Sequence, residues 1–356
     1  MPAVDDVARW PAADRAALLQ ETAARPNMPG AVAVEKDFWV CWTLQRAFAP
    51  PLVPGMVFKG GTSLSKVYGV IARFSEDLDL SIPREALGFA GDADLTPGLS
   101  RTQAGRRLDD MRAACEAHVA GPLVDVLRRR MAAALHGGVP ADTGVAERWE
   151  LVVAPDEPGT LLFRYPAALP AVAYGAAAYI RPSVRLEFGG RNEVWPSEVG
   201  SVRPYALEAF PDVSAEPWVA VQVLAAERTF WEKATICHAE YHRPPASRRG
   251  ERLSRHYVDL AALAQGDIGP RALAQLDLLA AVAAHKARYF PLGWARYDEA
   301  RPGTLRLVPH PELERALRRD HAAMREMFFG PAPAFDAVLR TLRELEAVIG
   351  FPGTPG

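Results

Sequence analysis

Two aspartates two positions apart, Asp77 and Asp79, lie in the short run EDLDLSI at residues 76–82. A β-strand has a side-chain period of two, so both carboxylates share one face while Leu78 and Leu80 share the other. At about 3.3 Å per residue, an extended strand places the two aspartates roughly 7 Å apart. Ionised carboxylates this close repel each other, and a divalent cation between them removes the repulsion. The pair therefore predicts a cation site.

The ion that suits such a pair is Mg²⁺, which takes hard oxygen ligands and keeps positions for water and phosphate oxygens. We expect two Mg²⁺ ions at Asp77 and Asp79, or Mn²⁺ in their place. The alternative is an exposed edge strand whose acids only keep the protein soluble, since D-x-D is a common pattern.

A glycine turn precedes the aspartates. Gly60 and Gly61 end a predicted strand, and Thr62 or Ser63 is expected to cap a helix predicted over 63–74. A helix start approached by glycines can bind an anion, because the backbone comes close to a phosphate and a serine adds a hydroxyl. The spacing is neither GxxxxGK[ST] nor GxGxxG, and an ordinary strand-to-helix turn is the alternative. Together with the aspartates, the turn predicts a nucleoside triphosphate held with Mg²⁺ for phosphoryl or nucleotidyl transfer.

These residues carry a resemblance. GG-T-S, a helix and then D-L-D resemble the nucleotidyltransferase superfamily with its polymerase β-like fold. With EKDFWV, RTFWEKATICHAEYHR and RHYVDLAAL added, residues 33–265 resemble the AbiEii/AbiGii toxin family of nucleotidyltransferases. The resemblance implies an α+β (mixed α/β) fold with a central mixed sheet, followed by a mainly helical C-terminal domain.

The resemblance also implies an activity. It is that of a toxin from a bacterial toxin–antitoxin or abortive-infection system, with a cognate antitoxin as a further partner. The enzyme would transfer NMP from an NTP to an acceptor and release pyrophosphate. Some members of the family modify the tRNA acceptor end, so RNA is the favoured acceptor.

Nucleotidyltransferases of this kind usually carry a third metal-binding carboxylate on a neighbouring strand. Glu187 in PSVRLEFGG is the best candidate, since Val184, Leu186 and Phe188 form the apolar face and leave it on the other. A solvent-facing glutamate is the alternative reading of this position. Glu150, at the start of WELVVA, is the competitor.

The C-terminal half adds two candidates. By resemblance, Lys233 contacts the triphosphate, as a lysine point charge suits, and Asp259 orients the triphosphate or the acceptor. The family pattern R-D-x-x-D reads RHYVD here, so Arg255 and Asp259 match while His256 replaces the first acid. Ordinary surface roles remain the alternatives for Lys233 and Asp259.

Three other basic residues lie near the glycine turn. Arg73 is expected to pair with Asp77 or Asp79 or to steer phosphates, and Lys59 could do the same. Lys66 is expected on a solvated helix face. The basic segment HRPPASRRGERLSRH at residues 242–256 could contact the phosphates of an RNA, or be a polar loop between helices.

The composition of the chain limits which functions and which cellular compartment are possible. The chain has 356 residues and a formal net charge of −2, so any nucleic-acid-binding surface must be local. Three separated cysteines favour a reducing compartment. The most apolar stretch, residues 165–180, contains two prolines and is too short to cross a membrane, and no secretory signal is evident. We expect a cytoplasmic protein.

The order of predicted elements suggests two domains: a nucleotidyltransferase α/β domain over 1–205 and a helical domain over 206–356. Within the first, a helix is predicted over 33–49, one or two helices over 100–135, and strands over 149–154, 160–165 and 182–190. Beyond residue 200 the pattern is helical. Three rival functions remain: transfer to a protein or small molecule, a D-x-D glycosyltransferase, and a non-catalytic nucleotide-binding module.

Overall fold

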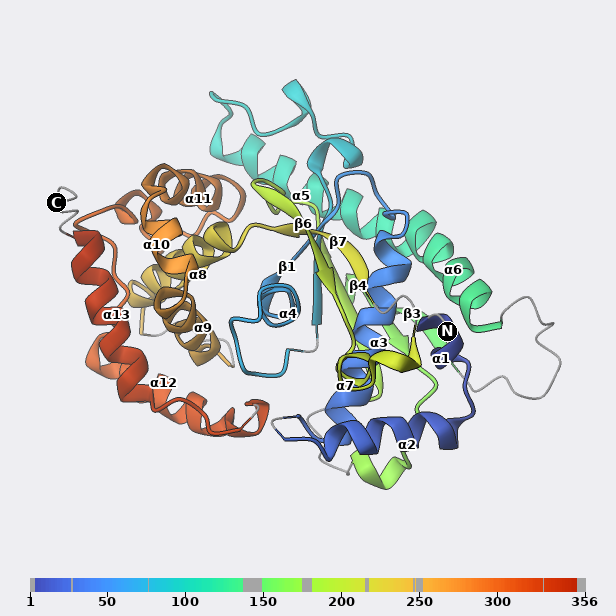
Figure 1. Cartoon of the computed structure of the whole chain (residues 1–356). Coiled ribbons are helices and arrows are strands. Elements are labelled where there is room, and N and C mark those ends of the chain that lie inside the picture. Colours follow the sequence, from blue (N-terminus) through green and yellow to red (C-terminus); the bar gives the residue numbers. More distant parts are fainter. Residues whose placement is uncertain are drawn as a thin grey trace. The chain divides into compact units, whose positions relative to one another are not determined.

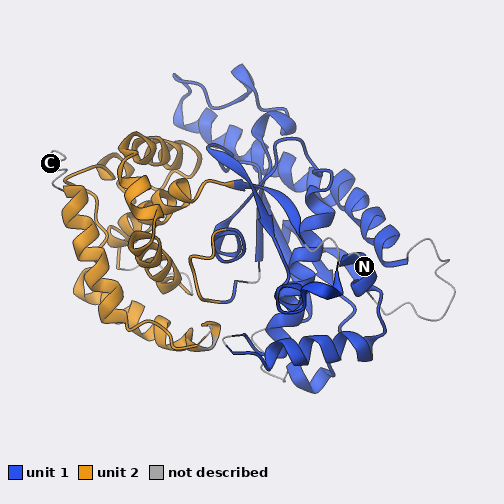
Figure 2. Ribbon diagram, viewed as in Figure 1, with its two compact units in different colours: residues 1–67, 74–223 blue, residues 68–73, 224–356 orange. Residues whose placement is uncertain are grey.

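The computed structural model describes residues 4–26, 28–75, 77–136, 149–174, 181–214, 218–245, 247, 252–328 and 330–350. The chain forms two compact units, shown in different colours in Figure 2. Unit 1 comprises residues 1–67 and 74–223, and unit 2 comprises residues 68–73 and 224–356. The division falls after Val223, and the short segment Tyr68–Arg73 is grouped with unit 2.

Unit 1 is built on a mixed sheet, which has seven strands in the described part of the chain and the order β3-β4-β5-β2-β1-β7-β6. Strand β2 pairs with β1 in antiparallel and with β5 in parallel orientation. The fold class predicted from the sequence is confirmed. The strands are β1 (Val57–Lys59), β2 (Asp77–Ser81), β3 (Glu150–Ala154), β4 (Glu157–Arg164), β5 (Ser183–Gly189), β6 (Ser197–Val202) and β7 (Val219–Leu224).

Helix α3 (Ala31–Phe48) packs on the apolar face of this sheet (Figure 1). Trp39 and Trp42 contact the ring of Phe163 on β4 with centroid distances of 5.9 and 5.5 Å. Phe163 pairs across with Val184 of β5, which is fully buried. Because α3 is buried along almost its whole length, it lies inside unit 1, and the helix predicted over 33–49 is confirmed.

Along the chain, the remaining helices of unit 1 come before the first strand of the sheet or between its strands. The stretch 100–135 forms two helices, because Gly121 and Pro122 interrupt the α-helical geometry and leave a π-helical turn between α5 and α6. Helix α5 begins with a capping box between Ser100 and Gln103. The helices are α1 (Val4–Ala8), α2 (Ala12–Ala23), α4 (Gly60–Lys66), α5 (Arg101–His118), α6 (Val124–His136) and α7 (Tyr205–Ala209).

Two predictions of secondary structure were wrong. The helix expected over 63–74 ends at Lys66, and the next residues run irregularly past Gly69, whose φ is +63°. Strand β7 lies in the region predicted to be helical, and β6 lies in the predicted α/β domain but was not predicted as a strand. Most of β6 is half or fully exposed and has little apolar alternation, so it leaves almost no period-two pattern to detect.

Unit 2 is helical, as predicted, and α9 is its centre. Helix α9 packs against α8, α10, α12 and α13. Its N-terminal end is held by Asp320 of α12, whose carboxylate accepts hydrogen bonds from the backbone N–H groups of Arg252 and Ser254. The helices are α8 (Ala226–Tyr241), α9 (Ser254–Gln265), α10 (Ile268–Leu273), α11 (Leu276–Tyr289), α12 (Pro311–Ala323) and α13 (Phe335–Gly350).

The three cysteines lie in the interior of the protein. Cys41, Cys115 and Cys237 are buried free thiols. Among the helices of the described ranges, none combines the length and the apolar character needed to cross a membrane.

Candidate functional site

The strand register brings three carboxylates to one face of the sheet. Strands β2 and β5 run parallel, and Asp79 lies directly opposite Glu187. Residues opposite each other on neighbouring strands point to the same side, so Glu187 shares the face of Asp77 and Asp79. Leu78 and Leu186 are fully buried on the opposite face and fix this orientation. Glu187 therefore lies on the face where the sequence analysis expected it.

The competitor, Glu150, lies elsewhere on the sheet. It begins β3, which is separated from β2 by β4 and β5, and it is paired with Arg164 across the β3–β4 hairpin. An exposed pair of this kind keeps the strand edge soluble and needs no catalytic explanation.

Glu187 is engaged by its neighbour Arg185. The Arg185 Nε donates to Glu187 Oε1 at 2.7 Å, and Arg185 also pairs with Glu157 of β4. Burial lowers the pKa of Arg185, but Glu187, Glu157 and Asp77 outweigh it, so the pKa is raised. The pairing of Arg185 with these acids shows that this face of the sheet has a negative potential, which favours a cation.

The residues present fit a Mg²⁺ ion that shares its coordination with substrate. Within the described ranges, no three Asp, Glu, His or Cys side chains are arranged to hold a metal ion by themselves. Asp77 and Asp79 are half-buried carboxylates on one strand face. Mg²⁺ commonly binds through one or two carboxylates and completes its shell with phosphate oxygens and water. Two aspartates therefore suffice for such a site, with Glu187 as an additional ligand only if it leaves Arg185.

The glycine turn packs directly against this acidic face. Gly60 has a φ of +81°, which favours glycine, and a Cβ built there would overlap the Oδ2 atom of Asp79. Lys59 lies opposite Asp79 in the register of β1 and β2. The close approach of backbone to carboxylate explains why glycine occupies position 60.

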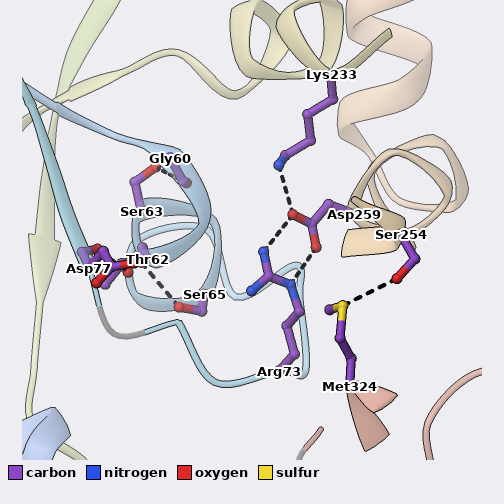
Figure 3. A network of polar contacts seen from close by, with 10 residues as sticks. All are labelled: Gly60, Thr62, Ser63, Ser65, Arg73, Asp77, Lys233, Ser254, Asp259 and Met324. Carbon is purple, nitrogen blue, oxygen red and sulfur yellow. Dashed lines mark hydrogen bonds and ion pairs between the residues drawn. The ribbon is translucent and has the colours of Figure 1, made fainter. Parts of the chain in front are cut away.

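The hydroxyls of the turn do not cap the helix as expected. Helix α4 begins at Gly60 itself, with Lys59 at the N-cap position and no side-chain cap. The Thr62 Oγ1 donates instead to the Asp77 carbonyl at 2.6 Å, and the Ser63 Oγ donates to the Gly60 carbonyl at 2.8 Å (Figure 3). Thr62 and Ser63 are buried. The Thr62 hydroxyl therefore joins α4 to the strand of the aspartates.

Lys66 is not solvated, contrary to expectation. Its Nζ lies 2.7 Å from Asp37 Oδ1 of α3, and both side chains are only 4% exposed. The error arose because the sequence pattern near Lys66 gives no sign of a buried acid on a helix that comes earlier in the chain.

Unit 2 contains a buried cluster of two cations around one carboxylate. Asp259 is fully buried, and Arg73 binds both of its oxygens, with Nε and Nη2 each at 2.7 Å (Figure 3). The Lys233 Nζ lies 2.7 Å from the Asp259 Oδ2, the oxygen that Arg73 Nη2 also binds. Burial would raise the pKa of Asp259, but Arg73 and Lys233 outweigh it and hold the pKa well below its usual range. Asp259 is therefore ionised and acts as an acceptor only.

The cluster gives Arg73 a partner that the sequence did not indicate. Its guanidinium pairs with Asp259 of α9. Sequence reasoning missed the partner because Asp259 is 186 positions away along the chain.

His256 adds no charge to this cluster near neutral pH. It lies one turn before Asp259 on α9, and its Nδ1 is buried with no hydrogen-bond partner among the described residues. Burial first, and then Lys233 and Arg255, lower its pKa well below the usual value. His256 therefore does not compete with Arg73 and Lys233 for the charge of Asp259.

Parts of the basic segment 242–256 have structural roles. The Arg243 guanidinium binds the Glu240 carboxylate and lies 4.2 Å from the ring centroid of Trp294. The backbone N–H of Arg252 donates to Asp320. Residues 246 and 248–251 of the proposed RNA-binding segment lie outside the described residues.

A comparison with protein-family models identifies the family of the chain. Residues 42–341 match the family model described as "Nucleotidyl transferase AbiEii toxin, Type IV TA system". A search of curated proteins gave no match.

Among solved structures, the chain is similar to MenT4, a nucleotidyltransferase toxin from Mycobacterium tuberculosis H37Rv. The match has 18% sequence identity and a TM-score of 0.51, and covers 95% of this chain and 89% of the other. At this identity the similarity supports the fold. The family model spans most of the length of this chain, and the chain therefore belongs to the AbiEii family of nucleotidyltransferase toxins.

Proposed function

We propose that this member of the family transfers NMP from a nucleoside triphosphate to an RNA acceptor, favouring tRNA, with release of pyrophosphate. The observation that carries the proposal is the β2–β5 register, which sets Asp77, Asp79 and Glu187 on one face of the sheet. Gly60 brings the backbone of the turn against that face. Acids beside a close-approaching backbone suit a metal-bound polyphosphate.

In the proposed reaction, an acceptor hydroxyl oxygen attacks the α-phosphorus of the triphosphate. A new P–O bond forms, the bond to the pyrophosphate oxygen breaks, and a carboxylate of the acidic face takes the hydroxyl proton. Asp77 and Asp79 would hold Mg²⁺, with Glu187 helping on the acceptor side. When bound, the ion would supply the positive charge that offsets the charge developing on the phosphate oxygens.

For unit 2, the proposal is that the cluster around Asp259 binds phosphate groups. Arg73 already occupies both oxygens of Asp259, so the ammonium of Lys233 is the group whose charge is least compensated. An ammonium carries three donors and suits phosphate oxygens as a point charge. Asp259 would then orient Lys233 rather than contact the acceptor, as a buried and fully engaged carboxylate must.

The partners and compartment follow from the same chemistry. Nucleoside triphosphate, Mg²⁺ and tRNA occur together in the cytoplasm, where we place the protein. The family relation makes a cognate antitoxin the expected further partner.

The direct test is transfer of label to total bacterial tRNA from each of the four α-³²P nucleoside triphosphates, with Mg²⁺ and with EDTA. We expect label on RNA with the wild type and Mg²⁺, and none with EDTA or with Asp79→Asn. A parallel reaction with γ-³²P label should leave the RNA unlabelled, because the β and γ phosphates depart as pyrophosphate.

Other outcomes would overturn the proposal in defined ways. Label on protein instead of RNA would replace the acceptor. Label from the γ position would indicate phosphoryl transfer. No transfer, with nucleotide still bound, would leave a binding module.

A further inference from the structure

A buried ion pair lies at the end of the helix that carries the glycine turn. Lys66 is the last residue of α4, and Asp37 lies in the first half of α3. Their charged atoms are 2.7 Å apart, with both side chains 4% exposed. The Lys66 Nζ also lies 3.5 Å from the ring centroid of Tyr205. A pair so fully removed from water is strongly coupled to its surroundings.

The same carboxylate also binds α7. The second oxygen of Asp37 accepts the backbone N–H of Tyr205 at 2.7 Å, at the first residue of α7. One acid therefore joins three helices. Burial would lower the pKa of Lys66, but Asp37 outweighs it and the pKa is raised, so Lys66 stays charged.

Helix α4 is thereby fixed at both ends. At its start, the Thr62 hydroxyl binds the Asp77 carbonyl, and Gly60 lies against the Asp79 carboxylate. At its end, Lys66 binds Asp37. Helix α3 is itself held against the sheet by Trp39, through its contact with Phe163. These contacts connect the sheet to α3, α3 to α4, and α4 back to β2.

We propose that Asp37 and Lys66 are positioning residues, which hold α4 so that the Gly60–Ser63 turn and the β2 aspartates keep the geometry needed for nucleotidyl transfer. The inference rests on the function proposed above. Neither residue touches the reacting atoms. A helix of seven residues is too short to be stable by itself, so the contacts at its two ends help to decide where the turn lies.

The test uses a double variant in which both charges are removed, Asp37→Asn with Lys66→Met. Replacing a buried pair by neutral residues of similar size often leaves stability unchanged, whereas a single change leaves one charge buried and unpaired. The matched control is Arg46→Met. Arg46 lies on the same helix α3 and binds Asp5 of α1, remote from α4 in its contacts.

The first readout is amide hydrogen exchange of peptides covering residues 59–66. We expect exchange about tenfold or more faster in the double variant, with the melting temperature unchanged, and no such change in Arg46→Met. Unaltered exchange over 59–66 in a folded double variant would overturn the proposal. This result does not depend on whether the protein transfers nucleotides.

The second readout is the kinetics of label transfer. A misplaced turn should lower kcat by about ten- to a hundredfold while the overall fold persists. Faster exchange with unchanged kcat would also overturn the positioning role, since the turn would then move without effect. If wild-type protein transfers nothing, the proposed function fails, but the exchange experiment still decides whether the pair holds α4.

Discussion

Units 1 and 2 both gather charged side chains, but in opposite ways. In unit 1 the acids of β2 and β5 are half-buried, and the backbone register sets where they lie. In unit 2 the carboxylate of Asp259 is fully buried, and the cations Arg73 and Lys233 set where it lies. The first group collects acids on a strand face, and the second pairs a buried acid with two cations.

The difference in burial decides whether the fold tolerates the loss of the charge. A half-exposed acid on a strand can lose its charge while β-sheet pairing holds the backbone in place. A buried acid between two cations cannot, because the cations would then be buried without a counter-charge. We therefore expect substitutions of the β2 aspartates to impair activity and substitution of Asp259 to impair stability.

The largest effect should come from Asp79→Asn. The change keeps the size of the side chain but removes the charge that holds the cation, so kcat/KM should fall by about a thousandfold or more. The free energy of unfolding should change by less than about 1 kcal/mol, since the side chain is half exposed and a neighbouring like charge is relieved. Label transfer and urea denaturation measure the two quantities. A large loss of stability would break the comparison between the units.

Asp259→Asn should have the converse effect. Removing the carboxylate deprives the buried Arg73 and Lys233 of the counter-charge that they share, and we expect a loss of about 3–5 kcal/mol in unfolding free energy.

Lys233→Met is the informative partner variant. It leaves Asp259 paired to Arg73 through both oxygens, so it should destabilise the protein much less while weakening nucleotide binding. Equal destabilisation by Asp259→Asn and Lys233→Met would contradict the assignment of Arg73 as the main counter-charge.

These cases show what periodicity can and cannot predict. The period-two pattern places Asp77 and Asp79 on one strand face, and the apolar alternation of PSVRLEFGG does the same for Glu187. That Asp79 and Glu187 are opposite each other depends on strand order, which the family resemblance supplied. Local pattern alone gives no register between strands more than a hundred residues apart.

The partners of isolated basic residues were beyond sequence reasoning. Lys66 looks like an exposed helix residue until α3 brings Asp37 beside it, and Arg73 binds an acid 186 positions away. Both pairs depend on tertiary packing. Strand β6 was missed for a related reason: most of it is half or fully exposed, so the core imposes no pattern on it.

Gly60→Ala should show that unit 1 relies on its backbone geometry. The new methyl group would overlap Asp79 Oδ2 at a residue whose φ is +81°, so the turn or the carboxylate must move. Displacement of a reacting group by about 1 Å can lower the rate by about a hundredfold. Gly88→Ala is the matched control, because Gly88 has a φ of +87° and no neighbour within 4 Å of an added Cβ. If both variants lost the same activity, backbone strain alone would explain the effect.

The smallest effect should be a difference between the two units in how their stability depends on pH. In unit 2, His238 Nδ1 accepts the backbone N–H of Arg306 at 3.1 Å, and Nε2 lies 2.9 Å from the carbonyl oxygen of Arg296. Protonation at Nδ1 would break the first of these bonds. Burial lowers the pKa of His238 and of the neighbouring His242 below 6.5, although the carboxylate of Glu299 opposes the shift.

Because the unfolded chain binds these protons first, the stability that the neutral histidines contribute is complete above pH 6.5 and is lost as the pH falls below it. In unit 1, burial raises the pKa of Glu35 and Glu208, so acid does not remove stability there in the same range. The protection of amides against exchange, taken relative to the intrinsic rate at each pH, should therefore fall in α8 but not in α3 between pH 7.5 and pH 5.5. His238→Asn can still accept the Arg306 N–H but cannot be protonated, so it should reduce the pH dependence of α8. An unchanged dependence in this variant would assign the acid sensitivity to another group.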